Sequence, residues 1–238
     1  MTSSAGSSSA VLPASSAEPP PIWFLAPEGF FALPLADGSA ERAERAESFV
    51  RQLYSRGDEE VWNPAAPVYA TLAERIGDTG VSYAALGLFS TSEVERTTTG
   101  DVARHDLSGG AAQCAFTLAA VPTDHEADAT DVVAQGIVAT LSKDTFNDVQ
   151  WLDLPCGPAV SCVTWRQYQL NPEVTATGEP TDLVTAEIQV HVPFPTGPFT
   201  AVFTLVTASV DQWTEFVDMM AGILQTISFT DPAEALAE

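Results

Sequence analysis

Apolar and polar residues alternate most regularly in the last third of the chain. Val184, Ala186, Ile188, Val190 and Val192 alternate with Thr185, Glu187, Gln189 and His191. This period of two predicts a half-buried strand that carries His191 on its exposed side. The segment from Pro193 to Pro198 is rich in proline and glycine, which favour turn conformations. A turn should therefore follow this strand.

Two further patterns complete this C-terminal module. Residues 200–208 are apolar on both sides, with Val202 and Val206 opposite Phe203 and Leu205, which predicts a central strand covered on both faces. From Asp211 the apolar period becomes helical. The predicted apolar stripe comprises Trp213, Phe216, Val217, Met220, Ile223 or Leu224, and Ile227. We interpret this stripe as the face of a helix that packs on the sheet.

The N-terminal half predicts a strand, two helices and a second strand. Apolar residues 22–25 and 30–33 flank a turn, and a helix should run from about residue 39 to 56 with Ser39 as its N-cap. Asn63 followed by Pro64 predicts the start of the next helix, which should end near Gly77. The buried stripe of this helix would contain Val68, Leu72 and Ile76. Residues 81–89 predict a strand.

The middle of the chain adds a strand at residues 114–121 and a helix at 129–141 with Val132 among its inward residues. A hairpin at 149–154 and 159–170 should turn around Pro155 to Pro158. The resulting order is typical of an α+β fold, with helices on one or both sides of an antiparallel six- to seven-stranded sheet. Residues 90–110 form a long polar loop that is either mobile or functional.

We expect three regions along the chain. Residues 1–21 are a Ser/Ala/Pro-rich tail that should be disordered, because they lack the apolar periodicity needed to offset the entropy of ordering. Residues 22–232 should form one α+β domain. Residues 233–238 are a short C-terminal tail.

One stretch is similar to a known family. The segment Ala26-Pro27-Glu28-Gly29-Phe30-Phe31-Ala32-Leu33-Pro34-Leu35 resembles the first strand of Mog1/PsbP-like and LpqN-like domains, and residues 199–229 resemble their final strand and helix. The resemblance implies an α/β/α sandwich on an antiparallel sheet, used for protein binding or assembly and without enzymatic residues. It transfers no partner-contact residue to this chain. The absence of a lipobox separates the chain from the exported lipoprotein members.

Charge narrows the class of partner. The chain has 32 acidic and 9 basic residues, a net charge of −23. Such a surface repels nucleic acid and anionic membranes, which bind clustered Lys and Arg. The charge fits a neutral or basic protein partner, or it serves solubility alone. The N-terminus lacks the pattern of a secretory signal, so we expect a cytoplasmic protein with reduced Cys114, Cys156 and Cys162.

The strongest polar cluster precedes the helix at 129–141. Asp124, His125, Glu126 and Asp128 carry ligand types that bind divalent cations. Acidic residues at this position also cap helices and complement the helix dipole, and the spacing matches neither an EF-hand nor a zinc-protease motif. We therefore predict no metal site and no cofactor, with these four residues as the only weak candidates.

The remaining reactive residues suggest no catalytic site. His105 and Asp106 lie in the long loop, and only the fold could bring them to His125. Cys114 and Cys162 fall in strands as small apolar residues, whereas Cys156 lies in a turn and is the exposed candidate. Trp151 and Trp165 could form an aromatic platform but are more typical of core packing.

From the sequence we expect a non-enzymatic protein-interaction domain that acts as an adaptor, assembly factor or chaperone-like accessory. Two alternatives remain open. The chain could be an immunity-type inhibitor of a basic toxin enzyme. It could also be a ligand-binding or enzymatic domain with a pocket between sheet and helices, near His125.

Overall fold

The computed structural model describes residues 18–90, 110–175 and 177–231. The predicted tail up to residue 17, His105, Asp106 and the terminal residues 232–238 lie outside the described residues. The helices are α1 (Ser39–Leu53), α2 (Glu59–Gly77), α3 (Thr130–Leu141) and α4 (Trp213–Gln225). The strands are β1 (Phe30–Ala32), β2 (Val81–Ser90), β3 (Ala111–Pro122), β4 (Asp148–Leu154), β5 (Gly157–Leu170), β6 (Thr181–Pro193) and β7 (Phe199–Thr207).

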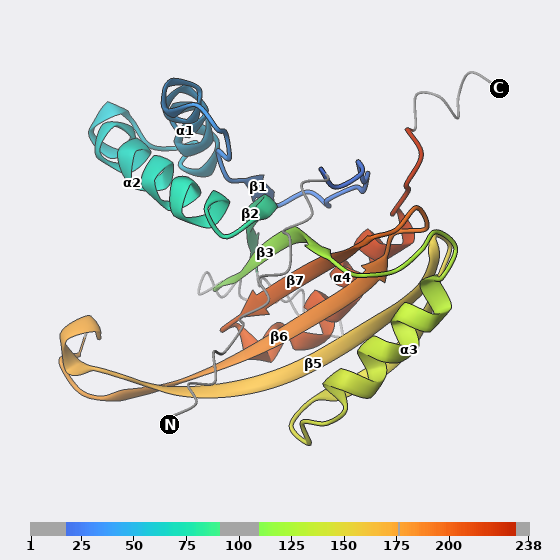
Figure 1. Cartoon of the computed structure of the whole chain (residues 1–238). Coiled ribbons are helices and arrows are strands. Elements are labelled where there is room, and N and C mark those ends of the chain that lie inside the picture. The colour runs from blue at the N-terminus through green and yellow to red at the C-terminus, as the bar shows by residue number, and fades with distance from the viewer. Residues whose placement is uncertain (1–17, 91–109, 176, 232–238) are drawn as a thin grey trace, which may run out of the picture.

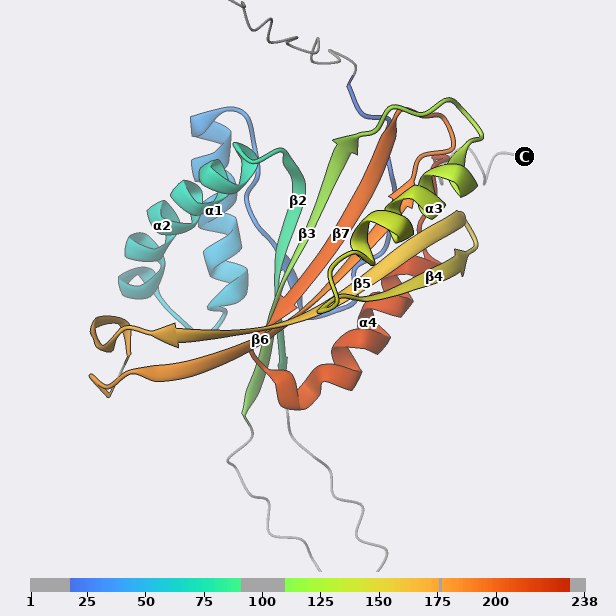
Figure 2. The same cartoon turned by 60° about the horizontal axis from the view of Figure 1, so that its bottom comes forward.

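All seven strands form one antiparallel sheet in the order β1-β2-β3-β7-β6-β5-β4. The predicted α+β class, the antiparallel sheet and the order of elements along the chain are confirmed. Helix α4 lies on one face of the sheet, whereas α1, α2 and α3 lie on the other (Figures 1 and 2). None of the helices in the described part of the chain combines the length and the apolar character needed to span a membrane.

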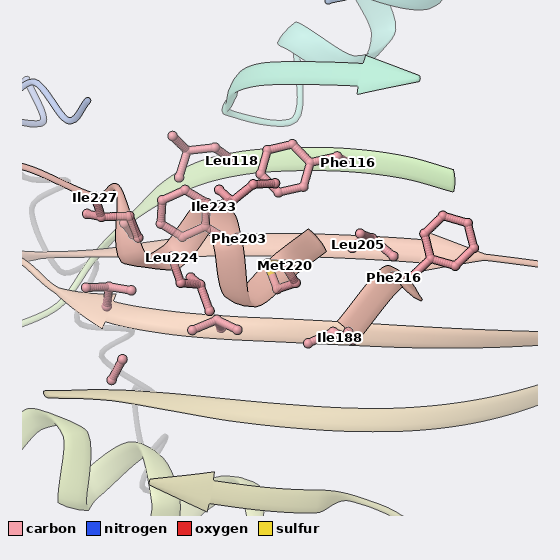
Figure 3. Packing of buried hydrophobic residues seen from close by; sticks show 14 of the residues in the cluster. Phe116, Leu118, Ile188, Phe203, Leu205, Phe216, Met220, Ile223, Leu224 and Ile227 are labelled. Atoms are coloured by element: carbon pink, nitrogen blue, oxygen red, sulfur yellow. The ribbon is translucent and has the colours of Figure 1, made fainter. Parts of the chain in front are cut away.

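The main core lies between α4 and the middle of the sheet (Figure 3). Phe116 of β3, Phe203 of β7 and Phe216 of α4 are fully buried there. Met220, Ile223, Leu224 and Ile227 extend the same helix face, so the predicted stripe of the closing helix is largely correct. Val217 is the exception, because it lies at the margin of the contact and is 38% exposed.

A second apolar cluster joins α1 and α2 to strand β2. Phe49 of α1 and Tyr69 of α2 meet edge to face with ring centroids 4.8 Å apart, and Ala66 and Ala73 of α2 are buried. The cluster combines large side chains with the buried alanines Ala46 and Ala66, whose small side chains allow the two helices to approach closely.

The predicted start of α2 is wrong, and its predicted buried stripe is wrong for Val68 and Leu72, whereas Ile76 is partly buried against the second cluster. The helix begins four residues before Asn63, because the carboxylate of Asp58 accepts a hydrogen bond from the backbone N–H of Glu60 and caps it. Pro64 and Pro67 therefore lie inside the helix rather than at its start. The longer helix turns Ala66, Tyr69 and Ala73 inward. Val68 and Leu72 are 64% and 38% exposed.

Candidate interaction surface

The two faces of the central strands differ sharply in burial. On the α4 side, Phe116, Leu118, Ile188, Phe203 and Leu205 are at most 4% exposed. On the opposite side the same three strands carry partly or fully exposed side chains, which we call the open face. Its residues are Ala115, Thr117 and Ala119 of β3, Val202, Thr204 and Val206 of β7, and Glu187 and Gln189 of β6.

The open face lies between two groups of helices. Helices α1 and α2 lie over β1 and β2, whereas α3 lies over β4 and β5 and also contacts β6, whose Glu187 and Gln189 stay partly exposed (Figures 1 and 2). Neither group covers the middle of β3 and β7 among the described residues. The prediction that residues 200–208 are covered on both faces is therefore wrong for the side that carries Val202 and Val206.

The chemistry of the open face changes from one strand to the next. On β3 and β7 it is made of Ala, Val and Thr, whereas β6 contributes Glu187 and Gln189. The Gln189 side-chain amide donates a hydrogen bond of 2.6 Å to the Glu187 carboxylate. Among the described residues both ion pairs lie on α1 and α2, so this carboxylate has an amide but no cation as its partner.

Acidic residues outnumber basic ones in the half of the chain that contains β3, β6 and β7. Burial raises the pKa of the Cys162 thiol, and the charges of Glu187, Asp148 and Asp144 raise it further. Lys143 and Arg166 are the only basic residues between residues 111 and 231, where the sequence has fifteen acidic ones. The net negative charge of this part of the chain therefore favours a cationic partner.

The open face continues onto a projecting arm. Residues 166–170 of β5 pair with 181–185 of β6, but neither segment pairs with a third strand. Tyr168 stands opposite Leu183 on the same side as Glu187, and the tyrosine is 47% exposed. Figure 2 shows this arm extending beyond the rest of the sheet. Its two edges offer unpaired backbone groups.

Two buried polar atoms lie on the same side of the sheet. The Thr164 hydroxyl and the His191 Nε2 atom have no hydrogen-bond partner among the described residues. The sequence predicted an exposed His191, but Val160 and Val202 flank it on the neighbouring strands and it is only partly exposed. Burial lowers the pKa of His191 below its usual value of 6.5.

This lowered pKa predicts a pH-dependent stability. Below about pH 6.5 the unfolded chain binds a proton at His191 that the folded protein does not bind. The free energy of unfolding should therefore fall as the pH drops from about 7.5 to 5.5, and it should fall less in His191→Gln. Urea denaturation at several pH values measures the difference. Parallel curves for the two proteins would contradict the assignment.

The four weak metal candidates lie in the loop before α3, at a corner where this loop contacts the turn between β6 and β7. His125 Nδ1 is 2.9 Å from the Thr123 hydroxyl and its Nε2 is 3.2 Å from the carbonyl oxygen of Phe194. The backbone N–H of Asp128 also donates to the Pro195 carbonyl, so the loop braces the turn between β6 and β7. Asp124, Glu126 and Asp128 are exposed. The described residues contain no group of three side chains placed to hold a metal ion.

The cysteine side chains are poorly suited to nucleophilic chemistry. Burial raises the pKa of Cys114 to about 12 and raises that of Cys156 as well. Cys156 is partly buried against the main core, so the prediction of an exposed thiol is wrong. A raised pKa keeps a thiol protonated and weakly nucleophilic.

The two tryptophans of the hairpin form neither a shared platform nor a core pair. Trp151 stands opposite Val160 on the α3 side of the sheet and is 39% exposed. Trp165 points to the other side, where its ring centroid lies 5.1 Å from that of Trp213. It is 50% exposed.

Two hollows of the described structure involve α1 and α2, the second together with the start of β2, and neither is lined by His125. One, of about 410 Å³, is lined by Val50, Trp62, Ala66 and their neighbours. The other, of about 550 Å³, contains several ionisable side chains of α1 and α2. Its two arginines already have partners.

Arg42 bonds the Ala36 carbonyl and Glu74, and Arg45 bonds the Leu35 carbonyl and Glu41. These bonds tie the chain before α1 to the helix pair. This pocket thus contains the ionisable groups that a ligand-binding or catalytic site would need. Its two arginines, however, form hydrogen bonds that hold neighbouring segments of the chain together. The pocket lies between helices and strand β2, as the alternative predicts, but His125 does not line it.

Comparison with known proteins finds no relative of the chain. No family model matches the chain, and no curated protein or solved structure is significantly similar to it.

Proposed function

We propose that this chain is a non-catalytic protein-interaction domain that binds a neutral or basic protein through the open face. The observation that carries the proposal is the unequal burial of the central strands. The α4 side is packed as a core, whereas Val202 and Val206 on the other side remain partly accessible. Apolar side chains that stay accessible in the centre of a sheet are typical of a binding surface.

Charge supports the choice of partner. Glu187 lies on the open face and its carboxylate has no cationic partner among the described residues, and the stretch from residue 111 to 231 has fifteen acidic residues against Lys143 and Arg166. A basic partner would gain from this field both in the rate of encounter and in orientation. The immunity-type inhibitor is a special case of the same proposal, in which the partner is a basic toxin enzyme. The role implied by the resemblance to Mog1/PsbP-like domains is also protein binding.

The proposal can be tested by affinity capture with matched variants. We would compare the wild-type chain with Thr204→Lys/Val206→Lys on the open face and with Val132→Lys on the exposed side of α3. Val132 is 70% exposed, so its predicted inward position is wrong and its variant can control for added positive charge. Thermal denaturation would confirm that each bait is folded.

We expect a neutral or basic protein to co-purify in stoichiometric amount with the wild type and with Val132→Lys. The open-face variant should retain at least about tenfold less of it, which corresponds to roughly 1.4 kcal/mol of binding free energy. Equal recovery with the folded open-face variant would show that the partner binds elsewhere.

A further inference from the structure

We propose that the occupant of the open face is a single amphipathic helix that carries basic residues and belongs to the partner protein. This inference rests on the proposed function and specifies the partner segment. Four features of the described structure support it: the width of the uncovered strip, its backbone bonding, its chemistry and its charge.

The width of the open face matches one helix. Adjacent strands lie about 4.8 Å apart, so β3, β7 and β6 span roughly 10 Å from the first axis to the last. An α-helix with its side chains is about 10–12 Å across. Strand β7 is 9 residues long, or roughly 30 Å, which a helix of about 18–20 residues would cover. One more helix would complete the layer that α1, α2 and α3 begin.

Backbone bonding excludes an extended peptide from this surface. Strand β7 pairs with β3 on one side and β6 on the other, and β6 pairs with β7 and β5. The backbone N–H and C=O groups of these strands are therefore used inside the sheet. A ligand on the face meets side chains only, so it must satisfy its own backbone groups, as a helix does.

The side chains of the open face indicate which residue types the bound helix would carry along its length. Val202 and Val206 of β7, with Ala115 and Ala119 of β3, would contact apolar residues. Glu187 of β6 would contact Lys or Arg, because its carboxylate has no cationic partner among the described residues. The helix should therefore present an apolar stripe bordered on one side by basic residues.

Charge argues against a second copy of this chain as the occupant. Each copy carries a net charge of −23, so two copies repel each other. Residues 1–17 of a neighbouring copy also fit poorly, because their Ser/Ala-rich sequence has no apolar helical stripe.

Two synthetic peptides provide the test. Both would have 18 residues and the same number of Leu and Lys residues. One follows the helical period of 3.6, and the other alternates Leu and Lys with a period of two. Equal composition and charge remove the general attraction of any cationic peptide for an acidic protein. Fluorescence anisotropy would measure the dissociation constant of each peptide.

We expect the helical peptide to bind the wild-type chain at 1:1 stoichiometry and at least about tenfold more tightly than the alternating peptide. Thr204→Lys/Val206→Lys should raise the dissociation constant of the helical peptide at least about tenfold. Val132→Lys should change that constant by no more than about twofold. Equal binding of both peptides would overturn the inference. An affinity for the helical peptide that is the same in the wild type and in Thr204→Lys/Val206→Lys would overturn it too.

Two further outcomes would also overturn it, each in favour of another occupant. Tighter binding of the alternating peptide, lost in Tyr168→Asp, would assign the interaction to strand addition on the β5–β6 arm. Dimerisation of the chain alone in analytical ultracentrifugation, abolished by Thr204→Lys/Val206→Lys, would assign the open face to a second copy. If capture depends on the open face while the helical peptide fails, the proposed function holds and the helical occupant is wrong.

Discussion

Replacing Phe216 by alanine is expected to lower the free energy of unfolding by about 3–5 kcal/mol. The Phe216 side chain is fully buried between α4 and the sheet, and its ring lies 6.0 Å from that of Phe89 on β2. Truncation removes the apolar contact and leaves a cavity that the surrounding strands cannot fill. Because domains of this size are stable by about 5–15 kcal/mol, the variant should be close to unfolding.

The adjacent residue supplies the control. Val217 is on the same helix but is 38% exposed, so Val217→Ala should change stability by less than about 1 kcal/mol. Chemical denaturation of both variants gives the comparison. An unchanged midpoint for Phe216→Ala would mean that this helix face is not part of the core, and α4 would then become the better candidate for the binding surface.

The order of elements could be predicted from the sequence because each element has a clear period. The alternation from Val184 to Val192 and the helical stripe around Phe216 each extend over several turns or pleats. Sequence pattern was less informative for α2. Alanines at positions 66 and 73 give a weak apolar signal, so the pattern favours the larger Val68 and Leu72 as buried residues, whereas both are exposed. Close packing of helices selects small residues, which a hydrophobicity pattern undervalues.

The open face depends on which strands are neighbours, and the sequence alone does not give this. Strand β3 contains a signal, because the large Phe116 and Leu118 alternate with the small Ala115, Thr117 and Ala119. Such alternation predicts one packed side and one accessible side. It becomes a surface only when β7 pairs with β3, more than 75 residues later in the chain, and places Thr204 opposite Thr117. That pairing is set by tertiary structure.

The position of His125 also required the structure. Its sequence neighbours Asp124, Glu126 and Asp128 suggest metal binding, but the groups closest to its ring belong to Thr123 and to the distant Phe194. The turn between β6 and β7 brings Phe194 to this loop. A local motif cannot report such a contact, since the two segments are far apart in the sequence.

The β6–β7 turn packs closely against the loop that carries His125, and a substitution at Gly197 in this turn should have the second large effect on stability. Gly197→Ala should destabilise the protein by about 2–5 kcal/mol, the sum of two costs. Gly197 has φ +52, a left-handed conformation that costs other residues about 1–2 kcal/mol. An added Cβ would also lie 2.6 Å from the carbonyl oxygen of His125, and overpacking of this kind costs about 1–3 kcal/mol.

Gly178→Ala separates the two costs. Gly178 also has a positive φ, +69, but no atom would lie within 4 Å of its added Cβ, so only the conformational cost of about 1–2 kcal/mol should appear. The obstruction at Gly197 is backbone, which cannot rotate away as a flexible side chain would. Relief of the clash must therefore move the loop from Thr123 to Asp128 away from the turn, and the bond between the Asp128 N–H and the Pro195 carbonyl should weaken with it. Amide hydrogen exchange should accordingly increase at Asp128 in Gly197→Ala and stay unchanged there in Gly178→Ala. Equal losses of stability in the two variants, with no change in exchange at Asp128, would show that the corner yields easily and does not hold His125 in place.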